Sequence, residues 1–141
     1  MKRKEAIHDP KYNLHAWIIG QPKIGKGTWI GAFTVIDAQG GLSIGKGCDI
    51  SSGVHIYTHT TVKRCISERK YPGINKRPVK IGDFVYIGAN ATILMGVSVG
   101  HHSVIGAGCV VKEGTSIPPY SVVAGVPGRI TGDARKHQVR R

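Results

Sequence analysis

A six-residue periodicity between Ile81 and Val123 is the feature that most limits how this chain can fold. Every sixth residue is isoleucine or valine, and the residue two places earlier is small. The large positions are Ile81, Ile87, Ile93, Val99, Ile105, Val111, Ile117 and Val123, and the small ones are Val79, Val85, Ala91, Val97, Ser103, Cys109, Thr115 and Ser121. An α-helix would repeat after about 3.6 residues and a plain strand after 2. The spacing therefore predicts short strands, each followed by a corner.

Such a repeat is typical of a β-solenoid, in which successive coils stack at about 4.8 Å, the distance between hydrogen-bonded strands. A β-sandwich of short strands is the alternative all-β fold. Hairpins of unequal length would not keep a six-residue register over so many repeats. We therefore predict an all-β solenoid.

The same periodicity organises most of the chain as a single domain, residues 1–141, with the solenoid at about 16–125. The earlier large positions are Ile18, Ile24, Ile30, Ile36, Ile44, Ile50, Ile56 and Val62. The longer step before Ile44 contains Gly40-Gly41, which indicates a small insertion. Residues 1–15 are interpreted as a polar, partly helical lead-in, and residues 126–141 as a short C-terminal tail that caps the open end.

Residues 63–78 interrupt the repeat and are predicted to be a long loop that leaves the solenoid at one corner. The loop contains six Lys or Arg residues, Glu68 and two prolines. A disordered surface loop is the simplest interpretation. A functional loop is favoured, because long loops are usually functional and this one directly follows the unusual stretch GVHIYTHT.

The net charge of +12 first suggests a nucleic-acid ligand. No series of aromatic residues alternates with the basic clusters at Lys2–Lys4, in residues 63–80 and at the C-terminus, so we expect no nucleic acid as partner. A phosphorylated cofactor or substrate would use part of this charge. No apolar run is long enough to span a membrane, and the N-terminus lacks a signal-peptide core, so a cytoplasmic location is expected. Cys48 and Cys109 occupy small inward positions and Cys65 lies in the loop, which fits a reducing compartment.

His59 is the candidate catalytic residue. Val54 and Ile56 point inward, so His55, Tyr57 and His59 alternate outward or lie at a corner. Imidazole is the usual general base near neutral pH. A single surface histidine is more often without catalytic function, so the residue type alone does not establish this role.

The stretch IGANATILMGVSVGHHSVIGAGCVV, followed by VAGVPGR, resembles the hexapeptide-repeat acyltransferases, in particular the galactoside, maltose and serine acetyltransferases. The resemblance covers residues 18–130. It implies a left-handed parallel β-helix with triangular coils of about eighteen residues, a homotrimer, and acetyl-CoA as co-substrate. It also implies direct transfer to a hydroxyl or amine of a sugar or nucleotide sugar, with His59 as general base. His55 is the reserve candidate and His15 a weaker one. A covalent cysteine mechanism is disfavoured, since no cysteine neighbours His59 in sequence.

The resemblance also assigns residues to the coenzyme. Ala89 and Ala107 would offer backbone groups to the pantetheine arm, while Gly125 and Arg129 match the segment near the adenosine and its phosphates. Arginine suits phosphate because its guanidinium can form two parallel hydrogen bonds. Lys112 is a further candidate. Ordinary corner packing would explain Ala89 and Ala107 equally well, and a solvated surface lysine would explain Lys112.

Six residues are candidates for substrate contacts. Tyr86 stands where relatives carry Trp and would wall the acetyl pocket, and Asn90 lies near the same corner. Tyr71 and Asn75, with Lys76 and Arg77, belong to the loop. The sequence THTTVKR departs from the family's His-Pro start of the loop, which leaves the acceptor class open, and a basic loop would suit a phosphorylated or nucleotide-linked sugar.

A solenoid metalloenzyme resembling the γ-class carbonic anhydrases is the second hypothesis. Such a site needs three histidines around a metal with one open position. The candidates are His55, His59, His101 and His102. Their spacing does not obviously bring them together, and no metal ligands are assigned.

Overall fold

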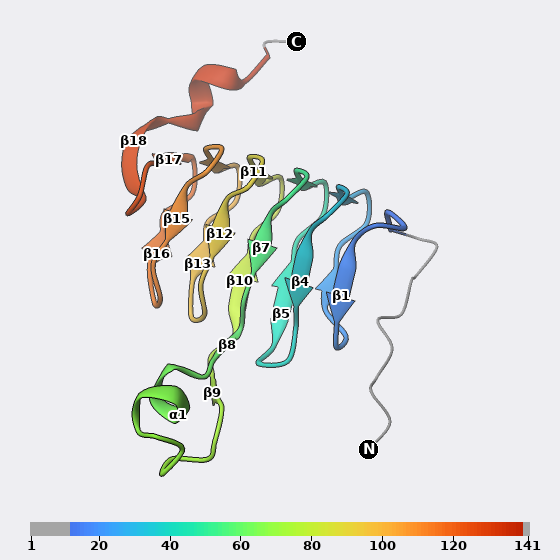
Figure 1. Ribbon diagram of the computed structural model, residues 1–141. Coiled ribbons are helices and arrows are strands. Elements are labelled where there is room, and N and C mark those ends of the chain that lie inside the picture. Colours follow the sequence, from blue (N-terminus) through green and yellow to red (C-terminus); the bar gives the residue numbers. More distant parts are fainter. Residues whose placement is uncertain (1–11, 140–141) are drawn as a thin grey trace.

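The computed structural model describes residues 12–139 and shows a β-solenoid built from three parallel sheets (Figure 1). The first sheet contains β1 (Trp17–Ile19), β4 (Val35–Asp37), β7 (His55–Ile56), β12 (Thr92–Ile93) and β15 (Val110–Val111). The second contains β2 (Lys23–Ile24), β5 (Leu42–Ile44), β10 (Val79–Ile81), β13 (Ser98–Val99) and β16 (Ser116–Ile117). The third contains β3 (Trp29–Ile30), β6 (Asp49–Ile50), β11 (Tyr86–Ile87), β14 (Val104–Ile105), β17 (Ser121–Ala124) and β18 (Arg129–Asp133). Five parallel strands per sheet mean five stacked coils.

The predicted six-residue register is confirmed. All eight large positions from Ile81 to Val123 are at most 4 % exposed. Each is the last or next-to-last residue of its strand and pairs with its equivalents in the adjoining coils, as Ile87 does with Ile50 and Ile105. Burying each such side chain contributes about 1.5–3 kcal/mol, so the repeat itself supplies the core.

Three corners join the sheets, and their positions matter for the site. The first corner leads from the first sheet to the second, the second corner from the second sheet to the third, and the third corner from the third sheet to the first sheet of the next coil. Glycines permit the coils to approach closely there: a Cβ on Gly88 would lie 2.5 Å from the backbone nitrogen of Ala107. The corners are therefore stacked into three columns along the solenoid.

The break in the repeat is an excursion from the first corner of the third coil. It comprises β8 (His59–Thr60), α1 (Val62–Ile66) and β9 (Asn75–Lys76), and β8 and β9 pair antiparallel at its base. The expectation that Val62 is an inward repeat position is wrong, because Val62 begins α1 and is 63 % exposed. Thr58 is still buried against Asp37 of the preceding coil. The next residue, His59, begins β8, so the chain leaves the solenoid there and not at residue 63. We call residues 59–78 the excursion (Figure 1, green).

The C-terminal segment covers part of the last coil. The turn after β17 closes the edge of β15, because Val110 donates its N–H to the Gly125 carbonyl at 3.1 Å and accepts from the N–H of Gly128 at 2.8 Å. β18 then runs antiparallel to β17, and a 3-10 helix (Ala134–His137) follows. The capping tail predicted from the sequence is thus present as far as residue 139. The lead-in expected over residues 1–15 lies mostly outside the described residues.

Among residues 12–139, no helix has the length and apolar character needed to cross a membrane.

Candidate functional site

His59 lies at the base of the excursion and is paired with a carboxylate from the preceding coil. Its Nδ1 lies 2.5 Å from Oδ2 of Asp37, which ends β4 and is fully buried. A carboxylate can only accept a hydrogen bond, so Nδ1 carries the proton. In the neutral ring Nε2 is then the free acceptor, and the His59 side chain remains 24 % exposed. The pair presents a histidine whose outer nitrogen is able to accept a proton.

Asp37 is held in place by backbone donors. Burial opposes its ionisation by desolvation, but the N–H groups of Thr58 and Gln39, each 3.0 Å from a carboxylate oxygen, and the ring of His59 outweigh that effect. The pKa of Asp37 is therefore lowered from its ordinary value. At neutral pH the carboxylate is charged and can stabilise a protonated His59.

The insertion at Gly40-Gly41 has a packing role beside this pair. A Cβ on Gly40 would lie only 2.2 Å from the carbonyl oxygen of Thr58, so only glycine fits there. Gly40 also donates its N–H to the Thr58 hydroxyl at 2.8 Å. Thr58 in turn binds both the carboxylate and the backbone carbonyl of Asp37. The glycine pair thereby supports the segment that holds Asp37.

Two further aromatic side chains extend from His59 along the outside of the first sheet. The rings of Tyr57 and His59 meet edge to face at 6.5 Å, and the Tyr57 hydroxyl lies 3.2 Å from Nδ1 of His55. His55 therefore lies near the His59–Asp37 pair, as a reserve base would have to. Its Nδ1, however, is paired with the hydroxyl of Tyr57. His15 lies elsewhere, stacked on Phe33 at 5.5 Å.

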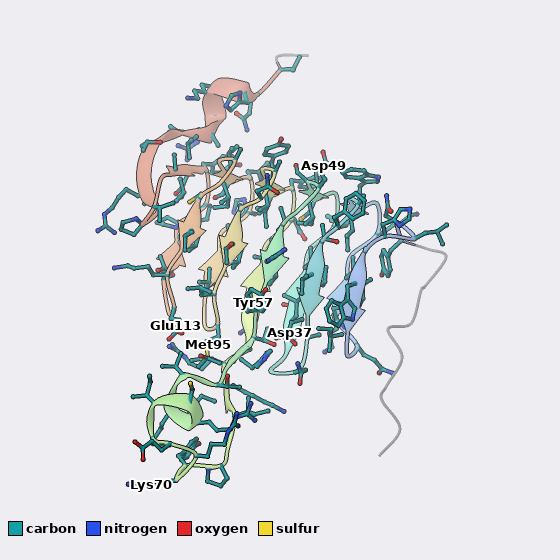
Figure 2. All side chains as sticks on the ribbon, in the orientation of Figure 1. Asp37, Asp49, Tyr57, Lys70, Met95 and Glu113 are labelled. Atoms are coloured by element: carbon teal, nitrogen blue, oxygen red, sulfur yellow. The ribbon has the colours of Figure 1, made fainter. Side chains whose placement is uncertain are left out.

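The excursion forms a pocket of about 530 Å³ against the first corner of the last two coils. Figure 2 shows Met95 and Glu113 at this edge of the solenoid, with Lys70 at the far end of the excursion. Asn75, a predicted substrate contact, lines the pocket. Tyr71 instead packs beneath the Lys63 ammonium at 4.3 Å, and its hydroxyl lies 3.5 Å from the Asn75 amide.

The structure separates the residues predicted to bind the coenzyme into two groups. Ala89, Ala107 and Gly125 follow one another along the third corner, and the Ala89 carbonyl accepts from Gly108 at 2.8 Å. Arg129 begins β18, just beyond this column. Lys112 follows β15 and lies on the first corner, the corner that carries the excursion. One chain therefore does not bring Lys112 and Arg129 to the same edge.

Tyr86 and Asn90 are also distant from His59 in the fold of one chain. Tyr86 is in β11 of the third sheet, 46 % exposed, and lines a pocket of about 180 Å³ beside the C-terminal 3-10 helix. Asn90 lies on the third corner with a left-handed φ of 61°. The excursion and His59 belong to the first corner. Contact between Tyr86 and a molecule bound at His59 would require a second chain.

The histidines of the metalloenzyme hypothesis do not converge within one chain. On the second corner, His102 is stacked on Tyr120 at 5.0 Å and meets the tilted ring of Phe84 at 5.1 Å, with Nδ1 of His101 2.8 Å from its own Nδ1. His55 and His59 lie on the first sheet and its excursion. Over residues 12–139 there is no group of three or more His, Cys, Asp or Glu side chains placed to hold a metal ion.

Asp37 is the residue at this site that the sequence analysis missed. The available signal was its position directly after the inward Ile36, at the start of the step lengthened by Gly40-Gly41. That lengthened step lies one coil before the excursion, so both irregularities of the repeat meet at the first corner. An acidic residue at the start of the lengthened step was therefore a candidate partner for His59.

Comparison with known proteins gives the same fold. The family model described as the hexapeptide repeat of succinyl-transferase matches residues 23–58 and 78–113, just over half of the chain. No curated protein sequence gives a significant match.

Three solved structures illustrate the similarity. A hexapeptide-repeat acetyltransferase of Vibrio cholerae, complexed with acetyl coenzyme A, is 31% identical with a TM-score of 0.70, over 80% of this chain and 60% of that one. A maltose O-acetyltransferase of Clostridium difficile is 27% identical with a TM-score of 0.66, over 82% and 65%. The N-acyltransferase AntD of Bacillus cereus, in complex with dTDP and 3-hydroxybutyryl-CoA, is 25% identical with a TM-score of 0.74, over 87% and 69%.

The chain spans about 60% of the length of the Vibrio cholerae protein. The repeats matched by the family model form the stacked coils of the solenoid, with the excursion as the interval between the two matched segments. The chain therefore belongs to the hexapeptide-repeat transferase family.

Proposed function

We propose that this protein transfers an acyl group, acetyl in the simplest case, from its coenzyme A thioester to a hydroxyl or amine of a small acceptor. The observation that carries the proposal is the pairing of His59 with the buried, charged Asp37. That pairing leaves Nε2 as a proton acceptor at an accessible position. Similar proteins, one complexed with acetyl coenzyme A and one with 3-hydroxybutyryl-CoA, support a CoA thioester as donor.

His59 acts as general base in the proposed reaction. Nε2 removes the proton from the acceptor hydroxyl or amine as the acceptor's oxygen or nitrogen attacks the thioester carbonyl. The carbon–sulfur bond then breaks, and the protonated His59 returns the proton to the departing thiolate. Asp37 stabilises the positive ring between these two steps. No covalent acyl-enzyme is needed, and Cys48 and Cys109 are buried in the core.

A sugar or nucleotide sugar is the proposed acceptor. The similar proteins include a maltose O-acetyltransferase and an N-acyltransferase in complex with dTDP. The excursion beside His59 contributes Asn75 and basic side chains to a pocket that could hold such a molecule. The same proposal assigns Ala89, Ala107, Gly125, Arg129 and Lys112 to the coenzyme. It assigns Tyr86 to the wall of the acetyl pocket and Asn90 to orienting the acceptor or the thioester.

These assignments require more than one chain, and we propose a homotrimer. His59 and Lys112 lie on the first corner or its excursion, whereas Ala89, Ala107 and Tyr86 lie on the third corner and third sheet. A cleft between adjacent chains would place the first corner of one opposite the third sheet of the next. Within a single chain, these two groups of residues lie apart and cannot form one site.

The proposed reaction is tested by incubating the protein with acetyl-CoA and a panel of sugars and nucleotide sugars. We expect release of free CoA thiol that depends on one class of acceptor, together with a matching gain of an acetyl group in that acceptor. Metal-depleted protein serves as control and should remain active. Hydration of carbon dioxide that requires a histidine-bound metal, without thiol release, would instead support the metalloenzyme.

Activity is expected to depend on assembly. Sedimentation at working concentration should give three chains per particle, and dilution that yields monomer should abolish transfer, because one chain lacks a complete cleft. The measurement is the rate of thiol release alongside the sedimentation profile over the same dilution series. A monomer that transfers acetyl at the undiluted specific rate would contradict the shared site.

A further inference from the structure

The pocket between the excursion and the last two coils combines three cations with an apolar floor. Lys63, Lys76 and Arg77 line it, with Glu113 as its one acidic residue. Met95, which is only 8 % exposed, and the side chains of Val62 and Ile66 complete much of the wall. The lining residues therefore carry a formal excess of positive charge beside three apolar side chains.

None of these three cations has an acidic partner. Over residues 12–139, the ion pairs join Asp37 to His59 and Asp133 to Arg135, and neither involves the pocket. The three cations outnumber the single carboxylate of Glu113, and like charges placed close together repel one another. A bound anion would offset that repulsion.

Two of the cations are held in position before any ligand arrives. The Arg77 guanidinium lies against the first corner of the last two coils, where a Cβ on Gly96 would come 2.6 Å from its Cζ and a Cβ on Gly114 would come 3.1 Å from one terminal nitrogen. The Lys63 ammonium sits 4.3 Å from the centre of the Tyr71 ring, in a favourable cation–π arrangement. Both contacts reduce the side-chain entropy that is lost when these groups bind a ligand.

The pocket is connected to His59 through the stem of the excursion. Lys76 is the residue directly opposite His59 in the β8–β9 pair, and Thr60 and Asn75 are the next pair and line the pocket. Side chains of directly opposed residues in an antiparallel pair lie on the same side. The long Lys76 side chain thus links the pocket to the side of the stem that carries the imidazole.

We propose that this pocket binds a phosphate ester or diphosphate belonging to one of the two substrates of the transfer reaction. Arginine and lysine suit phosphate oxygens, which accept charge-assisted hydrogen bonds. The apolar floor and the volume of about 530 Å³ leave room for the group to which the phosphate is attached. This inference deepens the proposed function and rests on it for the role of the phosphate, which belongs either to the acceptor or to the coenzyme.

Titration calorimetry at low ionic strength tests the site without any turnover. The probes are inorganic pyrophosphate, uridine diphosphate and adenosine 3′,5′-bisphosphate, the last representing the phosphate end of coenzyme A. The test variant is Lys63→Gln/Lys76→Gln, which leaves Arg77 seated on the glycines. The matched control is Lys23→Gln/Lys80→Gln on the outer side of the second sheet, which removes the same charge from β2 and β10. Thermal unfolding checks that both variants remain folded.

We expect pyrophosphate affinity to fall at least about tenfold in the test variant and less than about twofold in the control, because each lost cation removes a charge-assisted contact. Weaker binding of uridine diphosphate alone would assign the phosphate to the acceptor, and weaker binding of the bisphosphate alone would assign it to the coenzyme. Equal losses in both variants, or no binding of any probe by the unaltered protein at millimolar concentration, would overturn the proposal.

The same measurements separate this inference from the proposed function. If the unaltered protein binds the probes through the pocket but transfers no acyl group to any acceptor, the proposed function fails and the anion site stands. If transfer proceeds while the test variant binds pyrophosphate as well as the control does, the inference fails and the function stands.

Discussion

Replacing His59 by alanine is expected to lower the turnover number for acetyl transfer by about 100-fold or more. General-base catalysis contributes about 10²–10⁴-fold, and no other described side chain both pairs with Asp37 and exposes a free ring nitrogen. Binding of acetyl-CoA should change little, since the contacts proposed for the coenzyme are made by residues other than His59. Steady-state thiol release gives the turnover number, and calorimetry with CoA gives the affinity.

Two companion variants separate proton transfer from packing. His59→Gln keeps a side-chain amide that can donate to Asp37 but has no basic nitrogen, so it should be as inactive as His59→Ala while folding normally. His55→Ala removes the neighbouring histidine, which is bonded to Tyr57, and should retain most of the activity. Full turnover in His59→Ala, or its loss only in His55→Ala, would show that the base has been misassigned.

Replacing Asp37 by asparagine should lower turnover by about 100-fold and also destabilise the fold. Four donors, the N–H groups of Thr58 and Gln39, the Thr58 hydroxyl and Nδ1 of His59, share the two carboxylate oxygens. Asparagine has one acceptor oxygen, and its amide hydrogens would face donors. A buried donor left unsatisfied costs about 1–3 kcal/mol. Because Asp37 acts through His59, the KM for acetyl-CoA should stay within about twofold of its original value while the turnover number falls.

Asp49→Asn is the matched control, because Asp49 is an exposed aspartate on the outer side of the third sheet. Acid unfolding gives a second readout. The pKa of Asp37 is lower in the folded chain than the ordinary carboxyl value of about 4, so its contribution to stability is complete above that value and is lost as the pH falls through the lowered one. Asp37→Asn should lack this loss. An Asp37→Asn protein with unchanged turnover and stability would mean that the pair is dispensable.

The repeat could be predicted because its cause is local. Each hexad places one large and one small residue inward, and a shift of one residue would expose the large one. The register of Ile87 with Ile50 crosses the excursion and is still predicted by the spacing on either side. The first coil is less buried, since Ile18 and Ile24 are only partly covered and belong to strands at the edge of their sheets.

The start of the excursion could not be predicted from the same pattern. Val62 keeps the six-residue spacing and is aliphatic, yet it lies exposed in α1. The decisive contacts come from Asp37 and Gly40, which are close to Thr58 only after the coils have stacked. A periodic pattern carries no information about such a contact between neighbouring coils.

By itself, the sequence determined the stacked coils, their inward residues and the presence of one basic excursion, because hairpins of unequal length would not keep a strict period of six over so many repeats. It also identified His59 as a candidate. Only the tertiary structure decided that Asp37 is the partner of His59, that Arg77 rests on Gly96 and Gly114, and that Lys112 lies on a different edge from Ala107. Stacking brings together residues about eighteen or more positions apart, and hydrogen bonds at the corners depend on that stacking rather than on the residues nearby in sequence.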